Sequence, residues 1–86
     1  MTTDVVRNQL RDIFRKVAPE VDFDSIDLKR PLRDQVEIDS LDFYNILVHL
    51  HKATGVNIPD SAVMQMPSLE SLIHYVAKKT LENKDY

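Results

Sequence analysis

Three stretches of this chain carry apolar residues at the spacing of an α-helix that buries one face. In the first stretch, the apolar stripe consists of Val6, Leu10, Ile13, Phe14 and Val17. Thr2 or Thr3 can cap the start of this helix, because a side-chain oxygen there accepts a hydrogen bond from a free backbone N–H group. Pro19 stops the helix, since proline has no backbone N–H to donate. The pattern therefore predicts an amphipathic helix that ends before Pro19.

The second helix is predicted to run from about Asp39 to Thr54. Asp39 is a good N-cap residue, Asp42 completes a pattern similar to a capping box, and Gly55 is a good C-terminal stop. The core-facing stripe of this helix is expected to comprise Phe43, Ile46, Leu47, Leu50 and Ala53.

Further apolar residues of this helix lie on a different arc, namely Leu41, Tyr44 and Val48. The apolar face is therefore wider than one contact with a core requires. Either the helix is packed deeply inside the protein, or part of this arc contacts a partner. The serine next to the arc, Ser40, makes the second interpretation credible.

The remainder of the chain predicts two more helices. Pro59 ends the extended segment before it, and Asp60 can cap a short helix over residues 61–66. Ser68 can cap a last helix, whose stripe consists of Leu69, Leu72, Ile73, Val76, Ala77, Thr80 and Leu81. Residues 82–86 are expected to fray.

Residues 19–38 follow neither the helical nor the strand period, and prolines and aspartates interrupt them. We expect an ordered connection with a short helical turn after Pro31, held on the core by Ile26, Leu28, Leu32 and Val36. With no strand signal, the chain is predicted to be all-α. It should form one domain over residues 1–86, a four-helix bundle with three long helices, one short helix and a long first loop.

Composition limits the chemistry that this chain can carry out by itself. The 86 residues fit one small domain, and 43% of them are hydrophobic, enough for a single modest core. The absence of cysteine excludes disulfides and thiolate metal sites, so any thiol chemistry must arrive on a prosthetic group. A long apolar run and the layout of a signal peptide are also missing, so we expect a cytoplasmic protein without membrane insertion.

Charge is distributed unevenly along the chain, whose formal net charge is -3. Acidic residues outnumber basic ones between residues 20 and 42, whereas basic residues are in slight excess elsewhere. The acidic stretch repels nucleic acid and attracts basic protein surfaces, or it is only a solvated loop that charge keeps soluble. Both interpretations stay open on the sequence.

Ser40 stands where the acidic stretch ends and the second helix begins. A catalytic serine needs a base within hydrogen-bond reach, but the nearest histidine in sequence, His49, is about 13 Å further along the helix axis. The chain also has no Gly-x-Ser-x-Gly motif, so we expect no enzymatic activity. A helix N-terminus instead favours an attached phosphate group, and Ser40 is therefore predicted to be a modification site.

Metal and nucleic-acid sites are not indicated by the sequence. His49 and His51 point to different faces of the second helix, and His74 lies on the last helix, so no metal site is expected. No stretch combines basic and aromatic residues into a patch, so we expect no nucleic-acid binding.

Two segments are similar to those of a known family: Val36 to Asp42, with its Asp-Ser-Leu triplet, and Gly55 to Asp60, with its Ile-Pro-Asp triplet. With the predicted order of helices, nearly the whole chain resembles an acyl carrier protein. The resemblance implies that Ser40 bears a 4'-phosphopantetheine, which a phosphopantetheinyl transferase transfers from coenzyme A with Mg²⁺. The thiol of this arm would carry acyl groups as thioesters between enzymes, in a phosphoprotein of fatty acid biosynthesis and lipid metabolism.

The resemblance also implies two surfaces of the chain. Partner recognition would involve Asp39, Leu41, Asp42, Asn45 and Val48. An acyl chain folded back between the helices would contact Phe43, Ile46, Leu50, Ile58, Val63 and Met66. The implied partners are the transferase and an acyl-loading ligase, synthase or acyltransferase, and the carrier would act as a monomer.

Two departures from the family pattern distinguish this chain. Glu37 stands where related proteins usually have a glycine, three residues before the serine. Positions of the second helix that are often acidic carry Asn45, His51, Lys52 and Ala53. Basic partners find less to attract them there, so we expect a specialised rather than a housekeeping carrier. The alternatives are a peptidyl or aryl carrier of a nonribosomal-type pathway and an unmodified helical interaction module.

Overall fold

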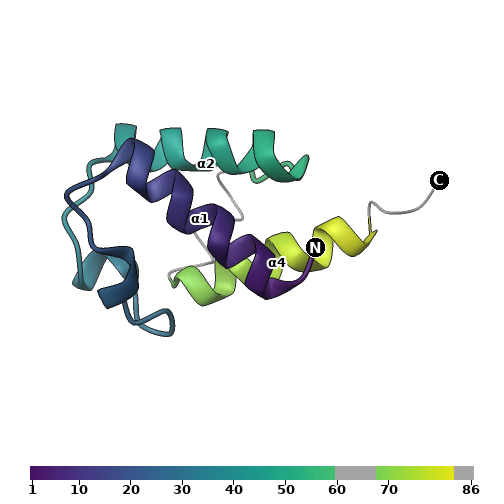
Figure 1. Cartoon of the computed structure of the whole chain (residues 1–86), viewed down its shortest axis with the longest axis horizontal. Helices are drawn as coiled ribbons and strands as arrows, with labels where there is room; N and C mark the ends of the chain where they lie inside the picture. Colours follow the sequence, from purple (N-terminus) through teal and green to yellow (C-terminus); the bar gives the residue numbers. More distant parts are fainter. Residues whose placement is uncertain (60–67, 83–86) are drawn as a thin grey trace.

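The computed structural model describes residues 1–59 and 68–82, and this part of the chain is helical without strands. Its elements are α1 (Thr3–Val17), the 3₁₀ turns η1 (Phe23–Ser25) and η2 (Leu32–Asp34), α2 (Ser40–Thr54) and α4 (Leu69–Glu82). α1 lies between α2 and α4 and contacts both (Figure 1). The all-α architecture is confirmed. The predicted short helix over 61–66, with its cap Asp60, lies outside the described residues.

None of the described helices is both long and apolar enough to span a lipid bilayer. The last of them, α4, continues to Glu82, and the rest of the tail predicted to fray, residues 83–86, lies outside the described part.

The start and end of α1 follow from its flanking residues. Thr2 Oγ1 accepts a hydrogen bond from the backbone N–H of Val5 at 3.3 Å, so Thr2 is the N-cap. The backbone N–H of Ala18 donates to the carbonyl oxygen of Phe14 at 2.8 Å and closes the helix. The predicted apolar stripe is confirmed: Val6, Leu10, Ile13 and Phe14 are buried, and Val17 packs partly buried against the core.

α2 and α4 are delimited in a similar way. Gly55 ends α2 in the left-handed conformation with φ 75°, which residues with a Cβ adopt only with strain. Ser68 precedes α4, and its Oγ accepts a hydrogen bond from the backbone N–H of Ser71 at 3.2 Å. Both predicted helix boundaries are confirmed.

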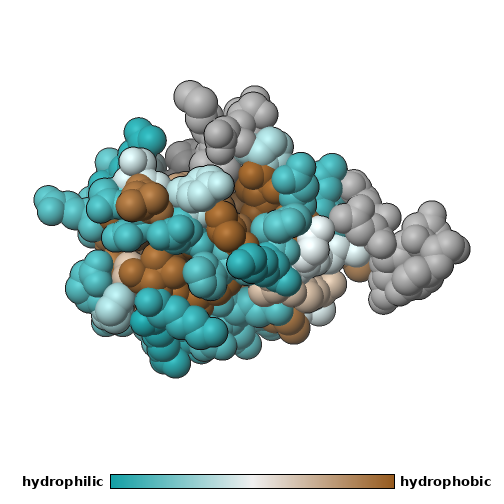
Figure 2. Space-filling view, turned by 90° about the horizontal axis from the view of Figure 1, so that it is seen from above, coloured by the Kyte–Doolittle hydropathy of each residue, from teal (hydrophilic) through white to brown (hydrophobic). Residues whose placement is uncertain are grey.

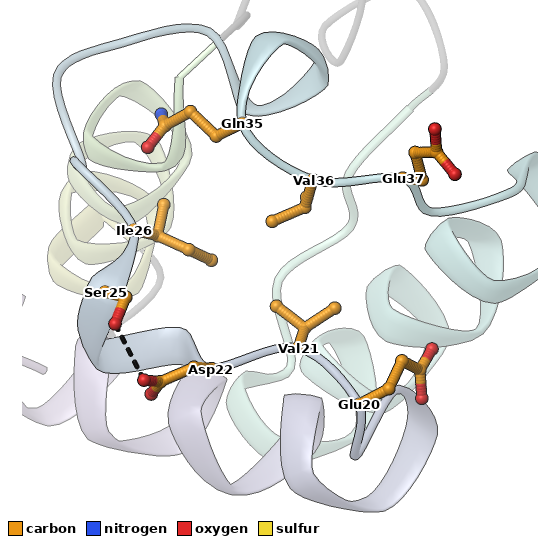
Figure 3. A pocket seen from close by; sticks show the side chains of 8 residues that line it. All are labelled: Glu20, Val21, Asp22, Ser25, Ile26, Gln35, Val36 and Glu37. Carbon is orange, nitrogen blue, oxygen red and sulfur yellow. Dashed lines mark hydrogen bonds between the residues drawn. The ribbon is translucent and has the colours of Figure 1, made fainter.

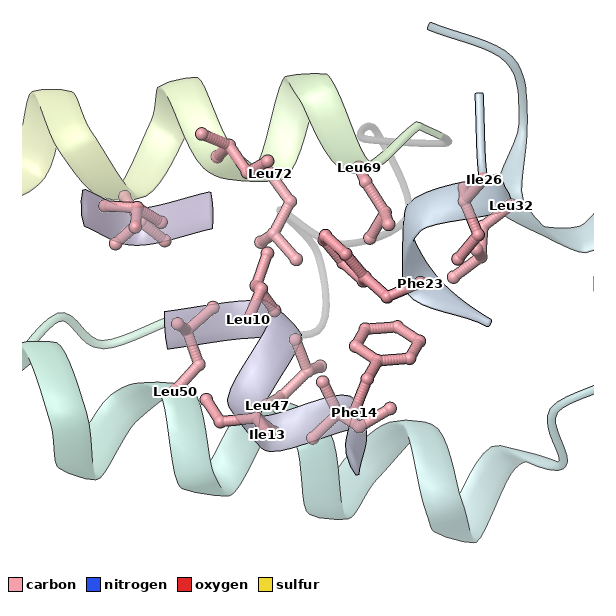
Figure 4. Packing of buried hydrophobic residues seen from close by; sticks show 14 of the residues in the cluster. Leu10, Ile13, Phe14, Phe23, Ile26, Leu32, Leu47, Leu50, Leu69 and Leu72 are labelled. Atoms are coloured by element: carbon pink, nitrogen blue, oxygen red, sulfur yellow. The ribbon is translucent and has the colours of Figure 1, made fainter. Parts of the chain in front are cut away.

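One hydrophobic core joins the helices to the long connection (Figure 4). The rings of Phe14 in α1 and Phe23 in η1 have centroids 5.3 Å apart and planes inclined by 57°, a favourable arrangement for an aromatic pair. The connection adds the predicted apolar residues to this core: Ile26 and Leu32, which are buried, and Leu28 and Val36, which are partly buried. The connection is therefore packed on the bundle.

The side-chain amide of Gln35 forms hydrogen bonds to backbone groups in the middle of the connection. Its Nε2 donates to the carbonyl oxygens of Asp27 at 2.8 Å, Arg30 at 3.2 Å and Pro31 at 3.3 Å. Its Oε1 accepts a hydrogen bond from the backbone N–H of Asp27 at 2.7 Å. One side chain thus supplies the hydrogen-bond partners of Asp27 N–H and of the Arg30 carbonyl oxygen, which no helix or sheet provides.

The connection is also tied to the start of α4. The backbone N–H of Glu70 donates to the carbonyl oxygen of Leu28 at 2.9 Å. Pro31 and Ser68 form an isolated antiparallel bridge. Hydrogen bonds to α4 and the contact of Phe23 with α1 therefore fix the connection from two sides.

Two residues assigned to buried stripes are exposed, and these assignments were wrong. Ala53 lies in the last turn of α2, where α1 has diverged from it (Figure 1). Leu81 is 63% exposed. The amino group of Met1, just before α1, donates to Thr80 Oγ1 at 2.9 Å, so the start of α1 lies beside Thr80 and does not cover Leu81. Both errors concern helix ends, where the apolar period continues but the neighbouring helix does not.

Gln35→Leu is expected to lower the free energy of unfolding by about 0.5–1.5 kcal/mol, because the backbone N–H of Asp27 loses its acceptor. Gln9→Leu is the matched control, since Gln9 Oε1 is buried without a hydrogen-bond partner among the described residues. That control should leave stability unchanged or raise it. Urea denaturation followed by circular dichroism measures both. Wild-type stability of the Gln35 variant would contradict the role given to this amide.

Candidate functional site

The first turn of α2 holds Ser40 at an exposed helix N-terminus. Asp39 is the N-cap, and its Oδ1 accepts a hydrogen bond from the backbone N–H of Asp42 at 2.8 Å. The carbonyl oxygen of Asp39 accepts from the backbone N–H of Phe43 at 3.0 Å. Ser40 follows as the first helical residue and is exposed. The predicted cap is confirmed, although the reverse bond of a full capping box, from Asp39 N–H to the Asp42 side chain, is not formed.

The positive end of α2 is accessible to an anion. Within the described residues, the backbone N–H groups of Ser40 and Leu41 have no hydrogen-bond partner, and the helix dipole adds partial positive charge there. The carboxylates of Asp39 and Asp42 oppose this charge in part. A phosphodiester on Ser40 Oγ meets hydrogen-bond donors at this helix end, so the residues present fit a phosphate-linked group.

No base is placed beside the Ser40 hydroxyl in the described part of the chain. His49 Nδ1–H donates to the carbonyl oxygen of Asn45 at 2.8 Å, and His51 Nδ1–H donates to that of Val56 at 2.8 Å. Both rings are thus bound to the backbone more than two turns along α2 from Ser40. Residues 1–59 and 68–82 also contain no group of three His, Cys, Asp or Glu side chains that could hold a metal ion. The arrangement suits attachment of a group to Ser40.

An apolar surface lies next to Ser40 on the outer side of α2. Leu41 is 67% exposed and Tyr44 is 59% exposed, and their spacing of three residues makes them neighbours on the helix. Asn45 and Val48, further along α2, are half-buried. Figure 2 looks onto α2 and shows apolar surface mainly over the end of the molecule where this helix begins. The wide apolar face of α2 is therefore not packed inside the protein at Leu41 and Tyr44.

The structure places the predicted recognition residues Leu41, Asn45 and Val48 along one side of α2, where only Leu41 is exposed. Asp39, exposed, and Asp42, half-buried, lie at the start of the helix. Tyr44 was missing from the predicted set, although its spacing from Leu41 had placed it on the same arc. The sequence pattern gives the arc, but only the exposure of the ring identifies Tyr44 as a surface residue.

The structure describes four of the residues predicted to line an acyl pocket: Ile46 and Leu50, which are fully buried, and Phe43 and Ile58, which are half-buried against the core. Val63 and Met66 lie outside the described residues. The acyl pocket therefore stays a prediction. A hollow that the sequence did not indicate lies elsewhere, between residues 20–26 and residues 35–37.

Comparison with known proteins places this geometry in a family. The family described as the phosphopantetheine attachment site matches residues 8–76, a range that includes Ser40. An acyl carrier protein homolog of Mycoplasma pneumoniae is 30% identical over 82 residues, which cover 83% of this chain and 96% of that protein. The chain belongs to the acyl carrier protein family.

Two further relatives agree with this assignment. An acyl carrier protein homolog of Mycoplasma genitalium is 27% identical over 73 residues, covering 85% of this chain and 86% of that protein. The acyl carrier protein of Phytoplasma australiense is 31% identical over 58 residues, covering 67% of this chain and 76% of that protein.

Membership has two consequences for the chemistry of this acyl carrier protein. The family's prosthetic group is 4'-phosphopantetheine, whose thiol forms thioesters when the group is bound. Its members are carriers and not enzymes. The lack of cysteine in the chain agrees with a thiol that arrives on a prosthetic group.

Asp39→Ala is expected to lower the free energy of unfolding by about 1 kcal/mol, because α2 loses its N-cap. Asp39→Asn keeps a side-chain acceptor and should remain within about 0.5 kcal/mol of the wild type. Thermal and urea unfolding measure both variants. Equal losses in the two variants would show that the negative charge, and not the cap, is what stabilises α2.

Proposed function

We propose that Ser40 is the residue to which 4'-phosphopantetheine is attached, so that this protein carries acyl groups as thioesters between enzymes. The position of Ser40 supports the proposal: its hydroxyl is exposed on the first turn of α2, beside N–H groups that have no partner among the described residues. An attachment serine needs no base of its own, because the transferase activates the hydroxyl during modification. The Asp39 cap keeps the hydroxyl at the helix end.

The other described serines fit the role of attachment site less well. The Ser25 hydroxyl donates to Asp22 Oδ2 at 2.7 Å. Ser68 is only 8% exposed, and its hydroxyl lies 2.9 Å from that of Ser71, with which it shares a hydrogen bond. Each of these hydroxyls is engaged by a neighbouring side chain, whereas Ser40 has no such contact within the described residues.

The proposal extends to a specialised carrier with its own loading ligase, synthase or acyltransferase. α2 has no acidic residue after Asp42, and its last turn carries His51 and Lys52. A basic enzyme surface is therefore attracted to the start of α2 and not to its end. The Asp-Ser-Leu triplet at Ser40 favours an acyl over a peptidyl or aryl cargo. In this proposal the carrier works as a monomer in the cytoplasm, in lipid metabolism such as fatty acid biosynthesis.

Incubation with coenzyme A, Mg²⁺ and a phosphopantetheinyl transferase is expected to add one phosphopantetheine to the wild type and none to Ser40→Ala. The matched control is Ser71→Ala, which removes another serine hydroxyl, half-buried in α4, and should be modified like the wild type. Intact-protein mass spectrometry reads all three. Modification of the Ser40 variant would refute the assignment, and an unmodified wild type would favour the helical interaction module.

A ketosynthase of general fatty acid synthesis is expected to elongate the acyl form of this protein at least about tenfold more slowly, in kcat/KM, than that of a housekeeping carrier, because α2 lacks acidic residues along its later turns. Adding them, in the double variant Asn45→Glu and Ala53→Glu, should recover part of the rate. Equal rates for the wild type and the housekeeping carrier would rule out the specialised role.

A further inference from the structure

The long connection has two limbs that face each other, residues 20–26 and residues 35–37. A hollow of about 350 Å³ lies between them, near the chain segment that leads into α2 (Figure 3). The side chains of Val21, Ile26 and Val36 point toward its centre from three sides. Glu20 and Glu37 stand on opposite limbs of the connection, both at the end of the hollow nearest to α2. The hollow thus combines apolar walls with a negatively charged rim.

The rim carboxylates have no cationic partner from the hollow itself. A third acid, Asp22, lines the hollow, and none of its lining residues is basic. The arginines of α1 pair with other acids, and no described arginine pairs with Glu20, Asp22 or Glu37. Asp22 Oδ2 accepts a hydrogen bond from Ser25 Oγ at 2.7 Å, which holds this carboxylate in place. The charge of the rim is therefore available to an incoming cation.

The shape of the hollow favours one kind of cation. Its three acids do not converge into a cluster that could hold a metal ion, and no such cluster exists elsewhere in the described residues. Arginine and lysine carry a charged head on an apolar stem, which can lie along valine and isoleucine while the head remains at the rim. A volume of about 350 Å³ is at the lower end of small-molecule sites, so it suits a single long side chain.

The hollow is also close to the residue that must be modified. Two residues, Ile38 and Asp39, separate Glu37 from Ser40, so the Cα atoms of Glu37 and Ser40 are at most about 11 Å apart. A transferase has to bring its active site to the Ser40 hydroxyl itself, whereas later enzymes act on the thiol at the far end of the arm. The transferase is therefore the partner whose surface must come close to Glu37.

We propose that this hollow receives an arginine or lysine side chain of the phosphopantetheinyl transferase, its stem against Val21, Ile26 and Val36 and its charged head between Glu20 and Glu37. The identity of the partner rests on the proposed function of Ser40. The affinity of the hollow for a cation with an apolar stem depends only on the connection. The two parts can therefore be tested separately.

The first test uses n-butylguanidinium as a mimic of an arginine side chain and the neutral N-butylurea as its control, with the unmodified protein. Two-dimensional amide NMR should show saturable shifts that n-butylguanidinium causes at residues 20–26 and 35–37. The variant Glu20→Gln/Glu37→Gln should lose these shifts, whereas Asp12→Asn/Asp34→Asn should keep them. The control pair removes the same charge from exposed positions outside the hollow. Equal shifts with N-butylurea, or shifts spread over all acidic residues, would overturn the cation site.

The second test measures kcat/KM of the transferase with the same variants. Glu20→Gln/Glu37→Gln should lower it about tenfold relative to Asp12→Asn/Asp34→Asn, and the difference should shrink as salt rises. Equal values for the two double variants would overturn docking of the transferase in the hollow. Asp22 is left unchanged, because its bond to Ser25 helps to form the turn.

The two tests also separate this inference from the proposed function. A wild type that no transferase modifies would refute the role of Ser40. The NMR experiment would still test whether the hollow binds a cation. A modified wild type without shifts at residues 20–26 and 35–37 would refute the hollow and leave the role of Ser40 intact. Circular dichroism of both double variants confirms that loss of binding is not loss of fold.

Discussion

The hydrogen bond from the backbone N–H of Asp42 to Asp39 Oδ1 determines where α2 begins, and the functional end of the molecule depends on it. Because the helix starts at Ser40, the hydroxyl stands on its first turn beside N–H groups that have no partner among the described residues. The same start sets the rotation of the helix, which turns Leu41 outward and Ile46 into the core. One side-chain cap thus positions both the proposed attachment point and the surface around it.

The long connection matters because it is ordered without being helical. A loop of this length is usually mobile, since it has few backbone partners of its own. Here the Phe23 ring packs on α1, the Gln35 amide satisfies backbone groups within the loop, and the N–H of Glu70 binds Leu28. These contacts hold the connection on the bundle, and a hollow lies between its two limbs near the start of α2.

The acidic residues of this carrier are concentrated in one part of the chain. Most carboxylates lie in the connection and the first turn of α2, whereas the last turn of α2 is basic. In the proposed function, this charge orients a basic enzyme toward the hollow and Ser40, and the exposed side chains of Leu41 and Tyr44 offer apolar contact there. A basic enzyme that is oriented by acids at the start of α2 does not need further acidic residues along the rest of this helix.

The sequence by itself determined the three long helices, the caps of α2 at Asp39 and Gly55, and the exposed serine, because capping and apolar periodicity act over only a few residues. It also allowed the family to be recognised from two short segments. It did not determine the exposure of Ala53 and Leu81, which depends on where a neighbouring helix ends. Nor did it indicate the hollow, whose walls come from separate limbs of the connection. Only the tertiary structure decided these features, since they arise where segments meet in space and no local pattern encodes that meeting.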